Sequence, residues 1–169
     1  MKNKEKVTQA DLDQLRALQY KTSCLERLLE ERCDLEDDFH QHLLALAIPN
    51  AEVYNDIIQR FEGDPSGVEF KSKSGTQWAF VLPDASEPGR HRIQYFDERS
   101  FFSHHSYSIV ADAVKAMISE GYCEEDAGAL DRNQTTETWR KGTAVAALKM
   151  QLDRGKLSWT EFIALAEAA

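Results

Sequence analysis

The sequence lacks any apolar run near the length of about 18 residues that a bilayer-crossing helix needs. Its first residues, MKNKEKVTQADLDQ, contain no apolar segment of the kind that follows the charged start of a secretory signal. We therefore expect a soluble protein of the cytoplasm. With 169 residues and 42% hydrophobic content, the chain is long enough for one compact domain with a hydrophobic core, which argues against a disordered chain.

Cysteine is also scarce, and its spacing does not suit cross-linking. The three cysteines are Cys24, Cys33 and Cys123, and none belongs to a CxxC pair. At about 100° per residue, Cys24 and Cys33 fall on opposite faces of a helix and cannot share a metal ion. We expect reduced thiols, with no disulfide framework and no structural zinc. The glycine motifs GxGxxG and GxxxxGK[ST] are absent as well, so no cofactor is predicted.

Basic residues are outnumbered, 20 against 29 acidic ones, and the net charge is −9. The acids concentrate in ERLLEERCDLEDD, residues 26–38, which holds seven acids and two arginines and is called the acidic segment below. An acidic surface repels phosphate backbones, so direct nucleic-acid binding is disfavoured. A nucleic-acid-associated regulator would depend on the cations of the predicted sheet: Lys71, Lys73, Arg90, Arg92 and Arg99.

Helical patterns dominate the first part of the chain. Thr8 and Asp11 have the spacing of a capping box, which predicts a helix start. Apolar residues then recur every three or four positions, which predicts a helical arm or hairpin over residues 1–48 that ends before Pro49. The leucines of this pattern either pack on their own domain or form a coiled-coil dimer: Leu12, Leu15, Leu18, Leu25, Leu28 and Leu29.

Residues 49–169 predict an α+β domain, either separate from the arm or continuous with it. A helix at 51–61 is capped by Asn50, and three alternating segments at 68–70, 76–82 and 90–96 predict a three-stranded antiparallel sheet. Further helices are predicted at 108–121 and 136–155, and a second capping box, Ser158 with Glu161, starts the last one. The expected order is N-terminal helices, sheet, C-terminal helices.

The stretch FDERSFFSHHSY, residues 96–107, is interpreted as a corner between the last strand and the next helix. Its four rings, Phe96, Phe101, Phe102 and Tyr107, are expected to pack against the sheet, and any exposed one becomes a candidate contact for a protein partner. Adjacent side chains in an extended segment point to opposite sides, so His104 and His105 are a poor metal pair. A small hydrolase or nuclease using these histidines is kept as an alternative.

Three segments resemble a known class of proteins. With IQYFDERSFFSHHSY, AVKAMISEGY and AGALDR, residues 93–132 are similar to small accessory proteins encoded on bacterial conjugative plasmids and integrative elements. The resemblance brings no catalytic residues. It implies a bacterial cytosol and partners in DNA transfer, plasmid maintenance or the countering of host defence.

The function predicted from these features is a non-enzymatic, acidic protein–protein interaction module, with inhibition of a host defence or nucleic-acid-handling enzyme (anti-CRISPR or antirestriction type) as its role. The expected partner is a protein with a basic surface, and a homodimer through the N-terminal helices is a further possibility. No catalytic, cofactor-binding or metal residue is predicted. The candidate partner-binding residues are Glu26, Glu30, Glu31, Asp34, Asp37 and Asp38 of the acidic segment, with Phe101, Phe102, His104 and His105.

Overall fold

The computed structural model describes residues 6–18, 20, 22–30 and 33–169. At its centre is an antiparallel sheet of five strands in the order β4-β3-β2-β1-β5. The strands are β1 (Glu69–Ser72), β2 (Gln77–Pro83), β3 (His91–Asp97), β4 (Phe101–Tyr107) and β5 (Tyr122–Glu125). The α+β class is therefore confirmed, and the three predicted strands are β1 to β3. The predicted strand number was wrong, because β4 and β5 form the two edges of the sheet.

The stretch predicted as a corner is a β-hairpin instead. Asp97 ends β3, and its Oδ1 accepts hydrogen bonds from the backbone N–H groups of Arg99 (2.7 Å) and Ser100 (3.1 Å). This side-chain turn reverses the chain within three residues, so β4 returns along β3. The residues FFSHHSY are consequently an edge strand rather than a loop.

Three helices precede the sheet: α1 (Gln9–Ala17), α2 (Ser23–Glu30) and α3 (Asp38–Arg60). The predicted capping box of Thr8 and Asp11 starts α1. The prediction that a helix ends before Pro49 was wrong, since α3 runs through this residue and across the domain boundary expected at residue 48. A proline inside a helix costs about 3 kcal/mol. Buried residues on both sides of Pro49 offset that cost: Leu44, Ala51, Tyr54 and Ile57.

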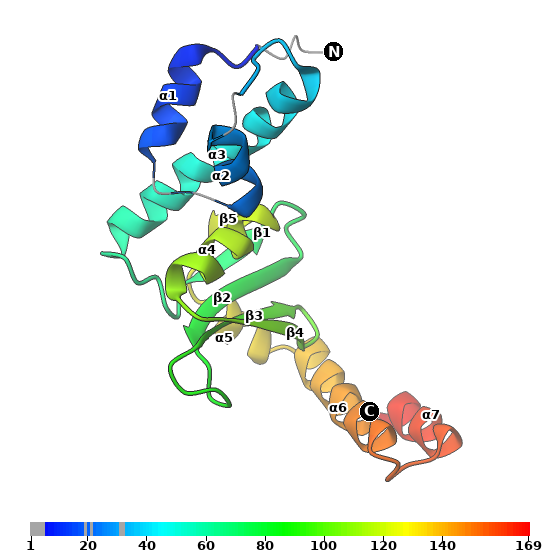
Figure 1. Ribbon diagram of the computed structural model, residues 1–169. Coiled ribbons are helices and arrows are strands. Elements are labelled where there is room, and N and C mark those ends of the chain that lie inside the picture. Colours follow the sequence, from blue (N-terminus) through cyan, green and yellow to red (C-terminus); the bar gives the residue numbers. More distant parts are fainter. Residues whose placement is uncertain (1–5, 19, 21, 31–32) are drawn as a thin grey trace.

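The main core lies between one face of the sheet and the helices. Helix α4 (Val110–Ser119) lies between α3 and the sheet (Figure 1). Leucines of α1 and α2 belong to the same buried cluster as β2, β3 and α4, among them Leu12, Leu15, Leu25 and Leu28. Packing of the N-terminal helices on their own domain is thereby confirmed, and these buried side chains are not free to pair with a second copy.

The opposite face of the sheet carries a smaller cluster of Trp78, Phe96, Ala129 and Trp139. It is covered by α5 (Ala129–Gln134) and the start of α6 (Glu137–Asp153). The carboxylate of Glu69 on β1 holds α5 in place, because it accepts hydrogen bonds from the backbone N–H groups of Ala129 (2.9 Å) and Leu130 (3.2 Å).

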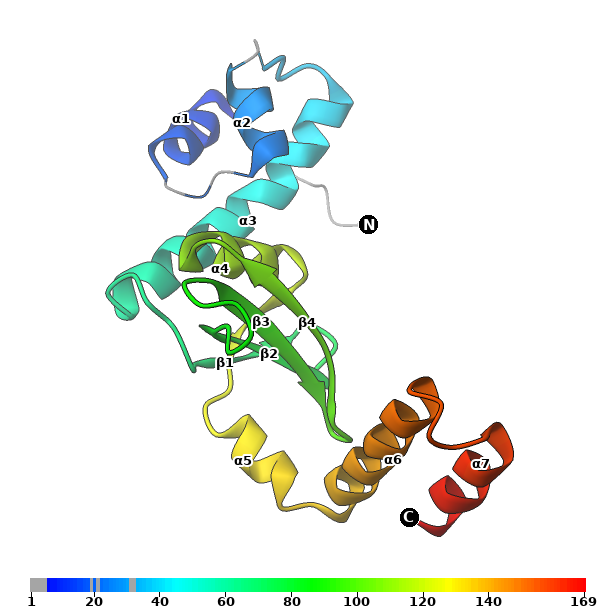
Figure 2. The same cartoon turned by 60° about the horizontal axis from the view of Figure 1, so that its bottom comes forward.

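Helix α6 continues beyond the sheet and turns back into α7 (Trp159–Ala168), which starts with the predicted capping box of Ser158 and Glu161. Figure 2 shows this helical hairpin extending away from the sheet, with the turn between the helices at its far end and the C-terminus returning beside α6. The molecule therefore has a packed sheet domain with the N-terminal helices on one side and a projecting hairpin on the other.

Candidate functional site

Strand β4 is the most exposed part of the sheet. Its inner edge pairs with β3, whereas no strand of the described residues lies along its outer edge. Phe101 is 42% exposed and Phe102 is 48% exposed, and His104 and His105 are exposed as well. We call these four residues the β4 edge surface. Of the four rings expected to pack against the sheet, Phe96 is fully buried and Tyr107 is partly buried against the core. Phe101 contacts Phe96 and Trp139 but stays partly exposed, as does Phe102, so these two are the exposed rings that become candidate contacts.

A break in the strand register explains the exposure of Phe102. Phe96 pairs with Phe101 and Tyr95 pairs with Ser103, so Phe102 is an additional residue between two partners. The ring of Phe101 meets the edge of Trp139 at a centroid distance of 5.3 Å, at the rim of the smaller aromatic cluster. In a regular strand, Phe101 and Phe102 would point to opposite faces and one of the two rings would be buried. With the bulge, both rings are partly exposed to solvent.

A hollow of about 500 Å³ adjoins the start of β4, between the β3–β4 turn and α6. Its apolar part comes from Phe102, Val145 and Ala146. The cations Arg99, Lys141 and Lys149 line it as well, and the two lysines lie 4.0 Å from Glu137 and 3.0 Å from Asp153, respectively. Asp97 also lines the hollow, but its carboxylate is paired with Arg99 at 3.0 Å. An apolar surface beside cations suits a partner segment that carries apolar and acidic side chains.

The two histidines lie on opposite faces of the strand. His104 stands opposite Gln94 and His105 stands opposite Ile93, and the ring of His105 is 5.7 Å from that of Tyr95. Across the described ranges, neither imidazole hydrogen-bonds to a carboxylate, and no three side chains of the metal-binding types gather into a possible ion site. The geometry thus offers no shared metal or relay for this pair.

The acidic segment lies at the other end of the molecule. Glu26 and Glu30 are exposed on α2, whereas Asp37 is the N-cap of α3 and accepts from the N–H groups of Phe39 (2.8 Å) and His40 (3.0 Å). These bonds lower the pKa of Asp37 below its ordinary value. Both views place α2 at the far side of the sheet from α6 (Figures 1 and 2). The structure does not bring the two predicted sets of residues together.

The remaining predicted acids have different surroundings. Asp34 accepts a hydrogen bond from the backbone N–H of Glu36 at 2.9 Å and shapes the turn before α3. Asp38 is exposed in the first turn of α3, where an acid suits the helix dipole. Glu31 lies outside the described residues. Two of the acids predicted to bind a partner, Asp34 and Asp37, therefore have local structural roles at the start of α3.

One residue near this site was missed from the sequence. Asp84, in the loop between β2 and β3, is buried and accepts from the hydroxyl of Ser106 at the end of β4. Its other oxygen accepts from the hydroxyl (2.7 Å) and N–H (2.9 Å) of Ser86 and from the N–H of Glu87 (3.3 Å). The local signal was the D-x-S spacing of a side-chain turn in PDASEPG. The contact ties β4 to the neighbouring loop.

These hydrogen bonds make the stability of the protein depend on pH in acid. The bond from Ser106 is the largest cause that lowers the pKa of Asp84 far below its usual range. The folded protein keeps this carboxylate charged where the unfolded chain protonates it, near about pH 3.9. Its contribution is therefore complete above that pH and is lost as the pH falls toward the folded pKa.

We expect Asp84→Asn to unfold at a lower urea concentration than the wild type at neutral pH, with a gap that narrows as the pH falls below about 4. Urea midpoints measured at several pH values check this. Five other carboxylates with lowered pKa are common to both proteins and cancel in the difference: Asp11, Asp37, Asp97, Asp126 and Glu161. A gap that stays constant with pH contradicts the expectation.

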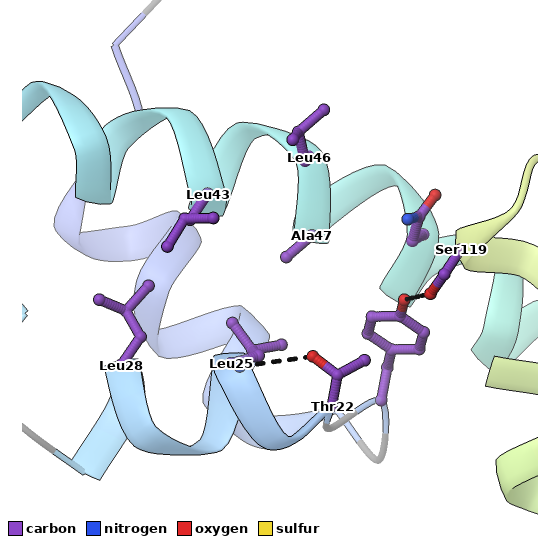
Figure 3. Close-up of a pocket in the computed structure, with 9 residues that line it drawn as sticks. Thr22, Leu25, Leu28, Leu43, Leu46, Ala47 and Ser119 are labelled. Carbon is purple, nitrogen blue, oxygen red and sulfur yellow. Dashed lines mark hydrogen bonds between the residues drawn. The ribbon is translucent and has the colours of Figure 1, made fainter. Parts of the chain in front are cut away.

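A separate cavity of about 140 Å³ lies between α2 and α3 (Figure 3). Leu25 and Leu28 of α2 face Leu43 and Ala47 of α3 across it. One end is polar, where the hydroxyls of Tyr20 and Ser119 share a hydrogen bond of 2.8 Å. Among the described residues that line it there is no carboxylate, histidine, lysine, arginine or cysteine. The lining therefore offers apolar packing, one hydroxyl pair and the polar side chains of Thr22 and Asn50, but no charged group.

The β4 edge surface and the adjoining hollow are thus the best-defined candidate site in the described part of the chain. Within the same residues, no helix has both the length and the apolar character needed to span a membrane. Comparison of the chain with models of known protein families, with curated proteins and with solved structures finds no match.

Proposed function

We propose that this chain is a non-enzymatic protein-binding module and that the β4 edge surface is its main contact. The observation that carries the proposal is an edge strand whose outer side has no neighbouring strand among the described residues, together with two partly exposed phenylalanines. Unpaired backbone groups of an edge strand accept an additional strand from a partner, and neighbouring side chains supply selectivity. Aromatic rings are the usual energetic centres of such contacts.

The adjoining hollow defines the chemistry of the partner segment. The apolar surface of Val145 and Ala146 favours an aliphatic or aromatic side chain. Lys141, whose Nζ is 4.0 Å from a carboxylate oxygen of Glu137, is the least tightly paired cation of the hollow and favours an acidic side chain. The partner is therefore a protein with an extended segment that carries both kinds of residue. Among the described residues, no three side chains of the metal-binding types gather into a possible ion site.

The setting follows from the resemblance of residues 93–132 to accessory proteins of bacterial mobile elements. In a bacterial cytosol, we propose an inhibitory role against a host defence or nucleic-acid-handling enzyme. A second candidate contact is the exposed part of the acidic segment, Glu26, Glu30 and Asp38, which suits a basic protein surface. It lies apart from β4, so the two surfaces are separable by mutation.

Capture from a bacterial lysate, followed by binding measurements with the purified partner, tests the proposal. The double variant Phe101→Ser, Phe102→Ser is expected to weaken binding at least about tenfold, as loss of aromatic contacts does at interfaces. Slower hydrogen exchange of the β4 backbone in the complex is expected in addition, because strand addition protects edge amides. Phe39→Ser is the matched control, since Phe39 is 65% exposed on α3, far from β4.

Three outcomes redirect the proposal. If Glu26→Lys with Glu30→Lys abolishes binding and the phenylalanine variant does not, the acidic segment is the contact instead. If a hydrolytic or nuclease activity is found and is lost in His104→Ala with His105→Ala, the protein is an enzyme. Binding to nucleic acid that falls steeply with salt would support the regulator that uses Arg90, Arg92 and the other cations of the sheet.

A further inference from the structure

The α6–α7 hairpin exposes a strip of large apolar side chains. Met150 of α6 is 53% exposed, and Trp159 and Ile163, four residues apart on one face of α7, are 65% and 39% exposed; we call these three residues the apolar strip. Leu165, 46% exposed, lies on the opposite side of α7 from Ile163. Helix α7 has no buried residue, and among the described elements α6 is the one with which it makes extensive contact. Single exposed apolar residues are ordinary, but a whole helix without a buried side chain is not.

A helix normally buries an apolar stripe against another layer, and a ten-residue helix has little stability by itself. Phe162 and Ala166 are half-buried in α7, while Trp159 and Ile163 flank them without cover. Beyond the sheet, α6 and α7 cover only each other, so the apolar side chains beside their contact have no second layer of described residues to pack against. Two such hairpins pack into a four-helix bundle, which buries the flanking residues of both.

We propose that the apolar strip binds a second copy of this chain, with the two α7 helices antiparallel about a twofold axis. Charge favours this occupant. Residues 137–158 contain five basic and two acidic residues, whereas α7 contains two acids and no base. The hairpin is therefore nearly neutral in a chain of net charge −9, and its two halves are complementary. Elsewhere, two copies of this acidic protein repel each other.

The antiparallel arrangement also pairs charges that have no partner within one chain. In the described residues, Arg154 and Lys156 in the turn before α7, and Glu167 at its end, take part in no ion pair. Two antiparallel helices of this length, about 15 Å, place the end of one beside the start of the other. Glu167 of each copy then lies near the start of its partner's α7, where the cations Arg154 and Lys156 outnumber Glu161, twice by symmetry.

This interface differs from the one expected from the sequence, which used the N-terminal helices. The leucines of that region are buried in the core of their own chain. It also differs from the β4 edge surface, so a dimer presents two such surfaces to other proteins. The double variant Phe101→Ser, Phe102→Ser is accordingly expected to remain dimeric.

Sedimentation of the purified full chain over a range of concentrations tests the proposal. The wild type is expected to reach twice its chain mass of 19.2 kDa. Ile163→Asp is expected to weaken self-association about 100-fold, because it buries an unpaired charge in the bundle. Phe39→Asp places the same charge on another exposed ring and is expected to leave the association unchanged. A single-chain mass at all concentrations, or an undisturbed Ile163→Asp dimer, overturns the proposal.

A charge exchange tests the arrangement even if Ile163→Asp fails to fold. Glu167→Lys alone, and Arg154→Glu with Lys156→Glu, are each expected to weaken the dimer roughly tenfold through two symmetric ion pairs. All three changes in one chain restore opposite charges across the axis and are expected to recover most of the affinity. A triple variant that associates more weakly than either parent overturns the antiparallel pairing.

Discussion

Replacement of Phe96 by alanine is expected to lower the free energy of unfolding by about 3–5 kcal/mol, the usual cost of removing a large buried ring. Phe96 is fully buried on the second face of the sheet. Its ring stacks on Trp78 at a centroid distance of 5.5 Å and meets the edge of Trp139 at 6.1 Å. The small cluster has few other members to fill the void, so α6 loses much of what attaches it to the sheet.

Chemical denaturation followed by circular dichroism measures this loss. Phe102→Ala removes the same number of atoms from a residue of the same hairpin that is 48% exposed, and is expected to cost less than about 1 kcal/mol. The difference between the two losses of unfolding free energy shows which of the two rings contributes to the core. Equal losses in the two variants would contradict the assignment of Phe96 to the core and Phe102 to the surface.

Local signals in the sequence predicted most of the fold. The capping boxes at Thr8 and Ser158 depend on residues three apart, so they need no knowledge of the rest of the chain. The alternation in TQWAFVL is visible because β2 is central: Trp78 faces the smaller cluster and Val81 faces the main core. In such elements, the local residue pattern is enough to predict the structure and the buried side.

The two strands that were not predicted, β4 and β5, have no such pattern in their sequences. An edge strand that is exposed on both faces has no alternation to read, and FFSHHSY shows polar and aromatic residues without a period of two. Strand β5 is only four residues long and continues directly from the turn after α4. The helix was predicted to end before Pro49 because the cost of a proline is local. The packing that offsets this cost depends on contacts of α3 with α1, α2 and α4, of which α4 is distant in the sequence.

The candidate site was predictable in part. Phe101, Phe102, His104 and His105 were selected by their composition, and they do lie on one strand. Their exposure depends on the position of β4 at the edge of the sheet and on the bulge at Phe102, and a residue pattern does not contain that information. The N-cap role of Asp37 could have been predicted from the sequence, because an acid just before a helical pattern is a standard N-cap.

The position of α6 depends in turn on one glycine. At Gly142, an added Cβ would lie 2.3 Å from the backbone oxygen of Arg99 in the β3–β4 turn. A real Cβ cannot approach a backbone atom so closely, and the backbone oxygen cannot move aside like a flexible side chain. The absence of a side chain at Gly142 therefore lets α6 rest directly on the hairpin that carries β4, and shapes the hollow beside it.

Gly142→Leu is accordingly expected to displace α6 and to lower the free energy of unfolding by about 3 kcal/mol, close to the cost of losing the burial of Trp139. Leucine favours a helix over glycine by nearly 1 kcal/mol, so a loss would come from the clash and not from the helix itself. Thr143→Leu adds the same side chain at the exposed neighbouring position and is the matched control, expected to change stability by about 0.5 kcal/mol or less.

Denaturation gives the free energies of unfolding of both variants, and hydrogen exchange in α6 and β4 shows whether these two elements have separated. Equal stability of both variants, with unchanged exchange, would mean that α6 does not rest on the β3–β4 turn and that the hollow beside β4 has another shape.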